Sequence, residues 1–163
     1  MRCYPWTHGK AALMGDAAHA TVPFYGQGMN ASLEDCHAMG RLMEEHNHNW
    51  EEIFKAYQNE RKPNGDAIQE LSKHNYLVMS DYVADPEFLL QKKFERRIQE
   101  LYPEKYIALY TMVSFTSIPY AEAWEKGQKQ DIFIKDIMAK NDVQNLFDAN
   151  KIDDLIHSVF KTI

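Results

Sequence analysis

The residues of this sequence whose types and spacing could do chemistry lie within its first thirty positions. A Gly15-Asp16 pair is followed by two alanines and His19. A carboxylate placed just beyond a strand can accept hydrogen bonds from a sugar hydroxyl, and small neighbours keep the following turn slim. The segment therefore predicts that Asp16 contacts a ribose or ribityl group.

A glycine-containing loop follows this motif and leads into a helix. Gly26 and Gly28 allow backbone amides to come close to a flat ligand. The helix expected from about Asn30 onward presents unpaired N–H groups and the positive end of its dipole, which stabilise an anion. Because each piece alone also fits an ordinary turn and helix cap, it is their combination that indicates a ligand site.

Two elements must position these groups. The apolar residues 10–14, ended by Gly15, predict a short buried strand whose sheet partners come from elsewhere, because no second strand is evident. From Asn30 onward a helix is predicted, with Ser32 and Asp35 as a weak capping pair near its start. The apolar face expected for this helix comprises Met29, Leu33, Cys36, Met39, Gly40 and Met43.

The remaining chain has the residue spacing of several helices. One begins near Trp50 and is expected to be kinked or interrupted at Pro63, and another follows Asp85. Residues 106–115 fit helix or strand, and helix is favoured. The chain by itself is therefore predicted to be mainly α. Its tail carries an apolar stripe at helical spacing that is expected to pack against its own protein: Ile152, Leu155, Ile156, Val159, Phe160 and Ile163.

Composition narrows the class of protein. The 163 residues carry 18 Lys and Arg against 24 Asp and Glu, a net charge of −6, without the basic stripe that nucleic-acid binding requires. The chain has only two cysteines, Cys3 and Cys36, which is typical of a protein in a reducing compartment rather than of a disulfide framework. His46, His48 and His74 lack a convincing set of metal-binding partners. With neither a secretory signal nor a membrane-spanning apolar run, a soluble, cytoplasmic protein is expected.

The motif and the loop together resemble a known signature. Residues 15–19 and 23–30 are similar to the second FAD signature of flavin-dependent aromatic hydroxylases. Residues 22–36, 71–76 and 110–123 narrow the resemblance to the kynurenine 3-monooxygenase branch, over the chain up to about Ala123. The resemblance implies an FAD-dependent enzyme that uses NADPH and dioxygen to hydroxylate the aromatic ring of L-kynurenine.

The resemblance also implies roles for individual residues. No side chain is assigned as catalytic, because the flavin supplies the hard chemistry while the protein binds, orients and excludes water. His19 is expected to be structural. The apolar settings of Asn75 and Tyr110 also fit ordinary core residues, but the resemblance gives them the amino-acid end of the substrate. The implied FAD contacts are Gly15, Asp16, Pro23, Gly26, Gln27, Gly28, Met29 and Asn30, and the implied substrate contacts are Pro23, Phe24, Gln27, Asn75 and Tyr110.

The sequence departs from the family in one large respect. It has no Gly-x-Gly-x-x-Gly loop for the FAD pyrophosphate, so it looks like a C-terminal portion that needs an N-terminal FAD-binding part and is inactive alone. Residues 1–48 would end an α/β, Rossmann-like FAD-binding domain, and residues 49–163 would form a helical substrate-capping region. A related hydroxylase with another aromatic substrate and a non-catalytic helical interaction module remain alternatives.

Overall fold

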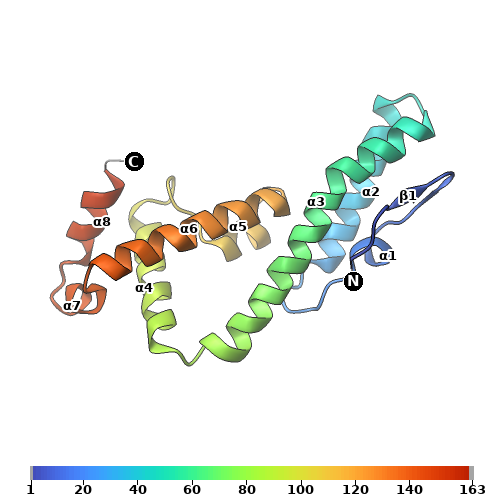
Figure 1. Ribbon diagram of the computed structural model, residues 1–163. Helices are drawn as coiled ribbons and strands as arrows, with labels where there is room; N and C mark the ends of the chain where they lie inside the picture. Colours follow the sequence, from blue (N-terminus) through green and yellow to red (C-terminus); the bar gives the residue numbers. More distant parts are fainter. Residues whose placement is uncertain (1, 162–163) are drawn as a thin grey trace. The chain divides into compact units, whose positions relative to one another are not determined.

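The computed structural model describes residues 2–161, and helices dominate it (Figure 1), as the sequence predicts. The chain divides into two compact units. Unit 1 comprises the chain up to Val78 together with Pro119–Glu122, and unit 2 comprises Met79–Ile118 and the segment from Ala123 onward. The assignment of residues 1–48 and 49–163 to two parts of a larger flavoprotein stays a prediction.

Unit 1 begins with a short β-hairpin. Strands β1 (Thr7–His8) and β2 (Ala11–Ala12) pair antiparallel, with Thr7 opposite Ala12, and Gly9 adopts a positive φ of 55° in the turn. The strand predicted at residues 10–14 is thus only two residues long. Its observed partner is local, contrary to the expectation that partners come from elsewhere, because a two-residue strand is too short to show a sequence pattern.

Three helices complete most of unit 1. They are α1 (Asp16–His19), α2 (Gly28–Glu45) and α3 (Trp50–Leu77). Helices α2 and α3 pack side by side (Figure 1), joined by a tight turn in which Asn47 and His48 have positive φ. Their shared core with the N-terminal segment comprises Trp6, Ala18, Leu42, Ile53 and Tyr57.

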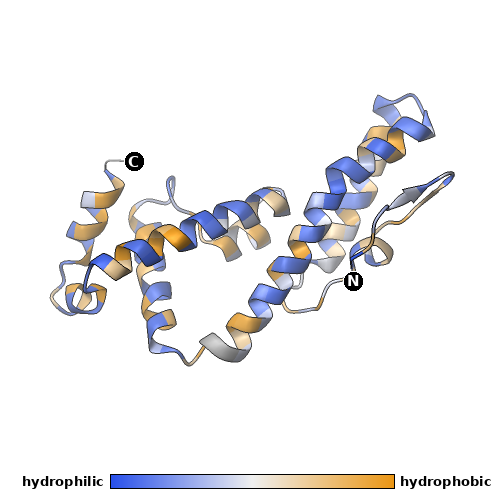
Figure 2. Cartoon of the chain, in the orientation of Figure 1, coloured by the Kyte–Doolittle hydropathy of each residue, from blue (hydrophilic) through white to orange (hydrophobic). Residues whose placement is uncertain are grey.

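The buried face of α2 differs from the predicted one. Met29 and Leu33 are 73% and 60% exposed and Cys36 is exposed, so this part of the expected apolar face is wrong. The long helices nevertheless interleave hydrophobic and hydrophilic residues, as Figure 2 shows. The buried face of α2 instead combines two alanines, a paired carboxylate and one leucine: Ala31, Asp35, Ala38 and Leu42.

Helix α3 is continuous through Pro63, so the predicted interruption is wrong. The neighbouring Asn64 donates a side-chain hydrogen bond to the carbonyl oxygen of Glu60 at 3.0 Å. Two residues further on, Gly65 lies against Trp6. A Cβ added at Gly65 would lie 2.5 Å from Cη2 of Trp6, so this position accepts only glycine without movement of the indole.

Unit 2 is helical in the part that the structure describes. The π-helix η1 (Val78–Tyr82) leads into α4 (Pro86–Leu101), α5 (Leu109–Phe115), α6 (Tyr120–Lys140), α7 (Val143–Asp148) and α8 (Ile152–Phe160). The first residue of η1 and the first three residues of α6 are assigned to unit 1. Helix α4 follows Asp85, as the sequence predicts, and the Asp85 side chain caps it by accepting from the amide of Glu87 at 2.9 Å. The helix favoured for residues 106–115 is present only from Leu109 to Phe115, as α5. None of the helices within residues 2–161 is long and apolar enough to cross a membrane.

The predicted stripe of the tail is confirmed as part of the unit 2 core. Ile152, Ile156 and Phe160 are buried against α4 and α6, while Ile163 lies outside the described residues. Arg97 on α4 holds α8 from the side, with two hydrogen bonds to the Asp153 carboxylate at 2.7 and 2.5 Å. The stripe is therefore an internal packing surface.

We expect Gly65→Ala to destabilise unit 1. Overpacking against Trp6 should cost about 1–3 kcal/mol, which outweighs a gain of about 1 kcal/mol in helix propensity. Gly40→Ala on α2 is the matched control, because nothing lies within 4 Å of an added Cβ there, and it should stabilise by about 0.5–1 kcal/mol. Urea unfolding followed by circular dichroism measures the change in the free energy of unfolding for both variants. If both substitutions stabilise or both destabilise the protein, the packing argument is wrong.

Candidate functional site

The Gly15-Asp16 turn presents a carboxylate to solvent. Gly15 has φ 56° and ψ −137°, a conformation that L side chains rarely adopt. Its carbonyl oxygen accepts from the amides of Ala18 and His19, both at 2.9 Å, and so starts α1. A Cβ at Gly15 would lie 3.0 Å from Oγ of Ser32, which shows that the turn lies directly against α2. The exposed Asp16 is therefore held on a turn whose position is set by α2.

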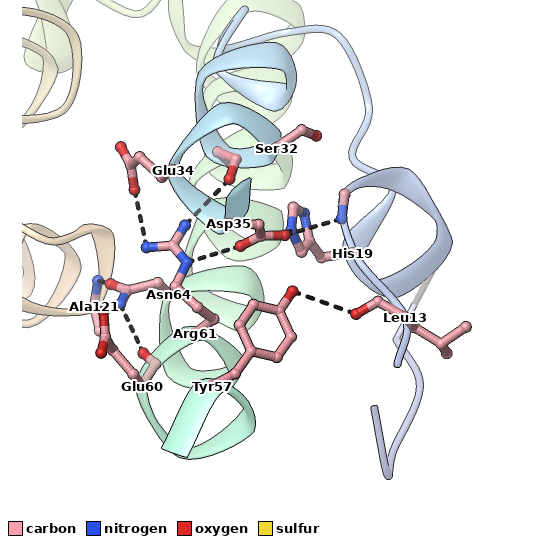
Figure 3. A network of polar contacts seen from close by, with 12 residues as sticks. Leu13, His19, Ser32, Glu34, Asp35, Tyr57, Glu60, Arg61, Asn64 and Ala121 are labelled. Atoms are coloured by element: carbon pink, nitrogen blue, oxygen red, sulfur yellow. Dashed lines mark hydrogen bonds and ion pairs between the residues drawn. The ribbon is translucent and has the colours of Figure 1, made fainter. Parts of the chain in front are cut away.

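A buried carboxylate on α2 bonds to this turn. Asp35 has an exposed fraction of 0%. Its Oδ2 atom accepts from the Gly15 amide at 2.9 Å and lies 2.6 Å from Nε2 of His19, and its Oδ1 atom accepts from Nε of Arg61 at 2.7 Å. Figure 3 shows this carboxylate between the imidazole and the guanidinium. Asp35 thus connects α1, α2 and α3 through a single side chain.

Arg61 supplies the charge that compensates Asp35. It is only 7% exposed and also donates to the Ala31 carbonyl oxygen at 3.2 Å and pairs with Glu34 at 3.0 Å. Burial raises the pKa of Asp35, but the hydrogen bonds from His19, Arg61 and Gly15 together lower it by more, so the net shift is downward. For Arg61 the directions are reversed: burial lowers its pKa, but the carboxylates of Asp35 and Glu34 raise it by more. Both groups are therefore held in their charged forms.

His19 has the structural role that the sequence predicts. It is buried, its ring lies 5.5 Å from that of Trp6, and its Nε2 bonds to Asp35. Among the described residues its Nδ1 atom has no hydrogen-bond partner. His19 therefore faces the core rather than a ligand.

The predicted capping pair of Ser32 and Asp35 is wrong. Helix α2 already begins at Gly28, the Ser32 hydroxyl donates to the Gly28 carbonyl oxygen at 2.9 Å, and Asp35 bonds outside its own helix. The sequence analysis missed Asp35 and Arg61 as site-forming residues. The available signal was an acidic residue on the face that Ala31 and Ala38 share, since a charge there must be paired.

The loop before α2 exposes most of its predicted ligand contacts. Pro23, Phe24, Gly26, Met29 and Asn30 are exposed, and Gly26 has φ 72°. The partly buried Gln27 lies beside Asn30, whose side-chain amide donates to Oε1 of Gln27 at 2.7 Å. These groups therefore gather at the start of α2, in the same unit as Asp16.

The two residues assigned to the amino-acid end of the substrate lie in different units. Asn75 on α3 donates from Nδ2 to the Phe24 carbonyl oxygen at 2.7 Å, and the rings of Phe24 and Tyr76 are 4.6 Å apart. The structure therefore brings Asn75 to the loop. Tyr110 on α5 in unit 2 is 55% exposed, so it is not a core residue, and its proximity to Asn75 stays a prediction.

Within residues 2–161 no group of three or more His, Cys, Asp or Glu residues could hold a metal ion.

The lowered pKa of Asp35 predicts acid sensitivity of unit 1. Because the folded pKa lies below the ordinary value of 3.8, the stabilisation is present above that pH and is lost as the pH falls through the folded pKa. We expect the free energy of unfolding to fall more steeply below about pH 4 in the unchanged protein than in Asp35→Asn. Urea unfolding at a series of pH values tests this, with Asp148→Asn, which changes an exposed aspartate, as the control. If the free energy of unfolding depends on pH in the same way in the unchanged protein and in Asp35→Asn, the prediction is wrong.

Comparisons with known proteins agree with the sequence resemblance. A family profile described as "FAD binding domain" matches residues 1–72. Kynurenine 3-monooxygenase of Flavobacterium johnsoniae is 44% identical over 157 residues, which is 96% of this chain and 35% of that protein. The enzyme of the same name from Christiangramia forsetii is 40% identical over 162 residues, 99% of this chain and 36% of that protein. That from Candida albicans is 42% identical over 136 residues, 83% of this chain and 30% of that protein.

These matches extend the similarity beyond Ala123, where the sequence resemblance was expected to end, into α6, α7 and α8. The chain spans about a third of the length of the curated relatives it matches, at 35% and 36% for the two bacterial proteins. Over nearly its whole length, therefore, the chain is similar to part of these kynurenine 3-monooxygenases.

Proposed function

We propose that this chain is the C-terminal portion of an FAD-dependent monooxygenase that uses NADPH and dioxygen to hydroxylate L-kynurenine to 3-hydroxykynurenine. The similarity to kynurenine 3-monooxygenases supports the reaction class. The carrying structural observation is that the exposed Asp16 turn and the start of α2 belong to one compact unit and are bonded together through Asp35. Two groups suited to the sugar and ring portions of a flavin nucleotide are thus held in fixed register.

The residues at this position fit FAD. Asp16 is an exposed acceptor for ribityl hydroxyl groups. An added Cβ at Gly26 would meet nothing within 4 Å, so the backbone there is open to close approach by a flat ring. The amides of Gly28, Met29 and Asn30 belong to the first turn of α2, which has no intrahelical acceptors, and they would stabilise negative charge on the reduced ring. Gly15 contributes by keeping the turn slim.

The substrate contacts divide between the loop and two helices. Pro23, Phe24 and Gln27 would line the aromatic part of L-kynurenine, since they belong to the exposed loop beside the proposed ring site. Asn75 and Tyr110 would hold its charged amino-acid end by hydrogen bonds. Asn75 also fixes the Phe24 backbone, so one side chain would link the loop to substrate binding.

Bound FAD would supply the redox chemistry with NADPH and dioxygen. The residues of this chain bind the cofactor, orient the substrate ring and keep water from the reacting groups. We propose that residues 1–48 complete an α/β FAD-binding domain and that residues 49–163 cap the substrate. The pyrophosphate contacts would come from an N-terminal part outside this sequence, without which the chain would have little activity.

The role of Asp16 is tested in a full-length enzyme that carries this segment. Asp16→Ala should weaken FAD binding by about tenfold to a hundredfold, because ribityl hydroxyls lose a charged acceptor, a cost of about 1–3 kcal/mol. Glu44→Ala, which removes an exposed carboxylate near the other end of α2, is the control and should bind FAD normally. Titration of the apoenzyme followed by flavin fluorescence gives both affinities. Unchanged FAD affinity in Asp16→Ala would disprove the assignment of the motif.

The role of Tyr110 is tested by separating substrate affinity from turnover. Tyr110→Phe keeps the ring and removes the hydroxyl, so it should weaken L-kynurenine binding by about tenfold to a hundredfold with a smaller effect on oxygen transfer. Tyr4→Phe is the matched control, since Tyr4 is an exposed tyrosine in unit 1. Substrate titration and the fraction of NADPH coupled to product are measured for each. If Tyr110→Phe binds L-kynurenine as tightly as the unchanged enzyme, Tyr110 is not a substrate contact.

A further inference from the structure

We propose that Asp35 is a positioning residue for the flavin site: it fixes the orientation of Asp16 through the Gly15 amide, with Arg61 as its buried counter-ion. The proposal rests on the proposed function of Asp16. It concerns a residue that itself makes no contact with a ligand, because Asp35 is fully buried. Its effect on FAD would therefore pass through the turn.

The contacts of Asp35 come from three separate elements. Oδ2 accepts from the Gly15 amide in the turn and bonds to Nε2 of His19 in α1, while Oδ1 accepts from Arg61 in α3. The Gly15 amide donates across twenty residues of sequence, so it fixes the turn to α2 rather than to its neighbours in the chain. Because Asp16 follows Gly15 directly, a hydrogen bond that holds the Gly15 N–H restrains the backbone from which the Asp16 carboxylate projects.

The turn is also limited by packing against α2. Gly15 lies so close to Ser32 that an added Cβ would approach Oγ to 3.0 Å and Cβ to 3.2 Å. The hydrogen bond from Gly15 to Asp35 and the contact with Ser32 therefore both set the turn against the same helix. Helix α2 also carries Gly28, Met29 and Asn30 at its start, so the same helix fixes both groups of proposed flavin contacts.

A carboxylate is required at position 35, rather than any polar group. All three neighbours of Asp35 offer N–H groups, and a carboxylate has two acceptor oxygens for them. An asparagine has only one acceptor oxygen, so its NH2 group would face at least one of these donors. The substitution would also leave Arg61, which is 7% exposed, with the exposed Glu34 as its remaining carboxylate. The turn would then lose its fixed attachment to α2.

The first experiment measures amide hydrogen exchange in the protein without ligand. In Asp35→Asn, the Gly15 amide should exchange at least about tenfold faster, whereas the control Glu34→Gln should leave it unchanged because the three bonds of Asp35 remain. A purely stabilising role would instead accelerate exchange throughout α2 and α3 in proportion. An unchanged Gly15 rate in folded Asp35→Asn overturns the proposal.

The second experiment is a double-mutant cycle on FAD affinity in a full-length enzyme carrying this segment. Asp35→Asn alone should weaken FAD by about tenfold, and adding it to Asp16→Ala should cause no further loss, because Asp35 acts through Asp16. Independent, multiplicative effects of the two substitutions overturn the positioning role. If Asp16→Ala alone leaves FAD affinity unchanged, it is the proposed function that fails, and the exchange result at Gly15 still reports on the turn.

If Asp35→Asn does not fold, the unchanged protein still decides the matter. The Gly15 amide should be protected at least about tenfold relative to an unstructured peptide, because its only described acceptor is the buried Asp35 carboxylate. An unprotected Gly15 amide in the folded protein overturns the proposal.

Discussion

Burying a carboxylate costs free energy unless its oxygens accept hydrogen bonds from neighbouring donors. Unit 1 is organised around this requirement at Asp35. The donors come from the turn at Gly15, from α1 and from α3, so satisfying one charge places three elements at once. Hydrophobic packing could bring α2 and α3 together in several registers. The fixed geometry of the Arg61 guanidinium against Asp35 favours one of them.

This arrangement separates the groups that hold the fold from those that would meet ligands. The interior of unit 1 takes the motif histidine and the glycine amide, whereas the motif aspartate is exposed. The same division applies to α2, where Ala31 and Ala38 face the interior while Met29 and Asn30 remain outside. A short motif can thus serve structure and binding together, because successive residues point in different directions.

Much of the helical architecture could be predicted from the sequence, because local signals determine it. Asp85 followed by proline starts α4, and the spacing of the tail predicts α8. The failures depend on tertiary contacts. The buried face of α2 includes a carboxylate paired across 26 residues with Arg61. Helix α3 continues through Pro63 because buried residues on both sides of the proline, such as Tyr57 and Ile68, pack in the core and outweigh one missing hydrogen bond. For the candidate site, the exposed residues that are proposed to face a ligand could be named from their types and from the family resemblance, whereas Asp35 required knowledge of its partners.

Because Gly65 lies so close to Trp6, the residue types that are allowed at these two positions, which are distant in sequence, depend on each other. The absent side chain at Gly65 provides the space for the edge of the indole, and that indole in turn packs beside His19. A larger residue at position 65 is compatible with this packing only when position 6 carries a smaller one. The two positions should therefore covary in related sequences, and a substitution at either is best interpreted together with the residue found at the other.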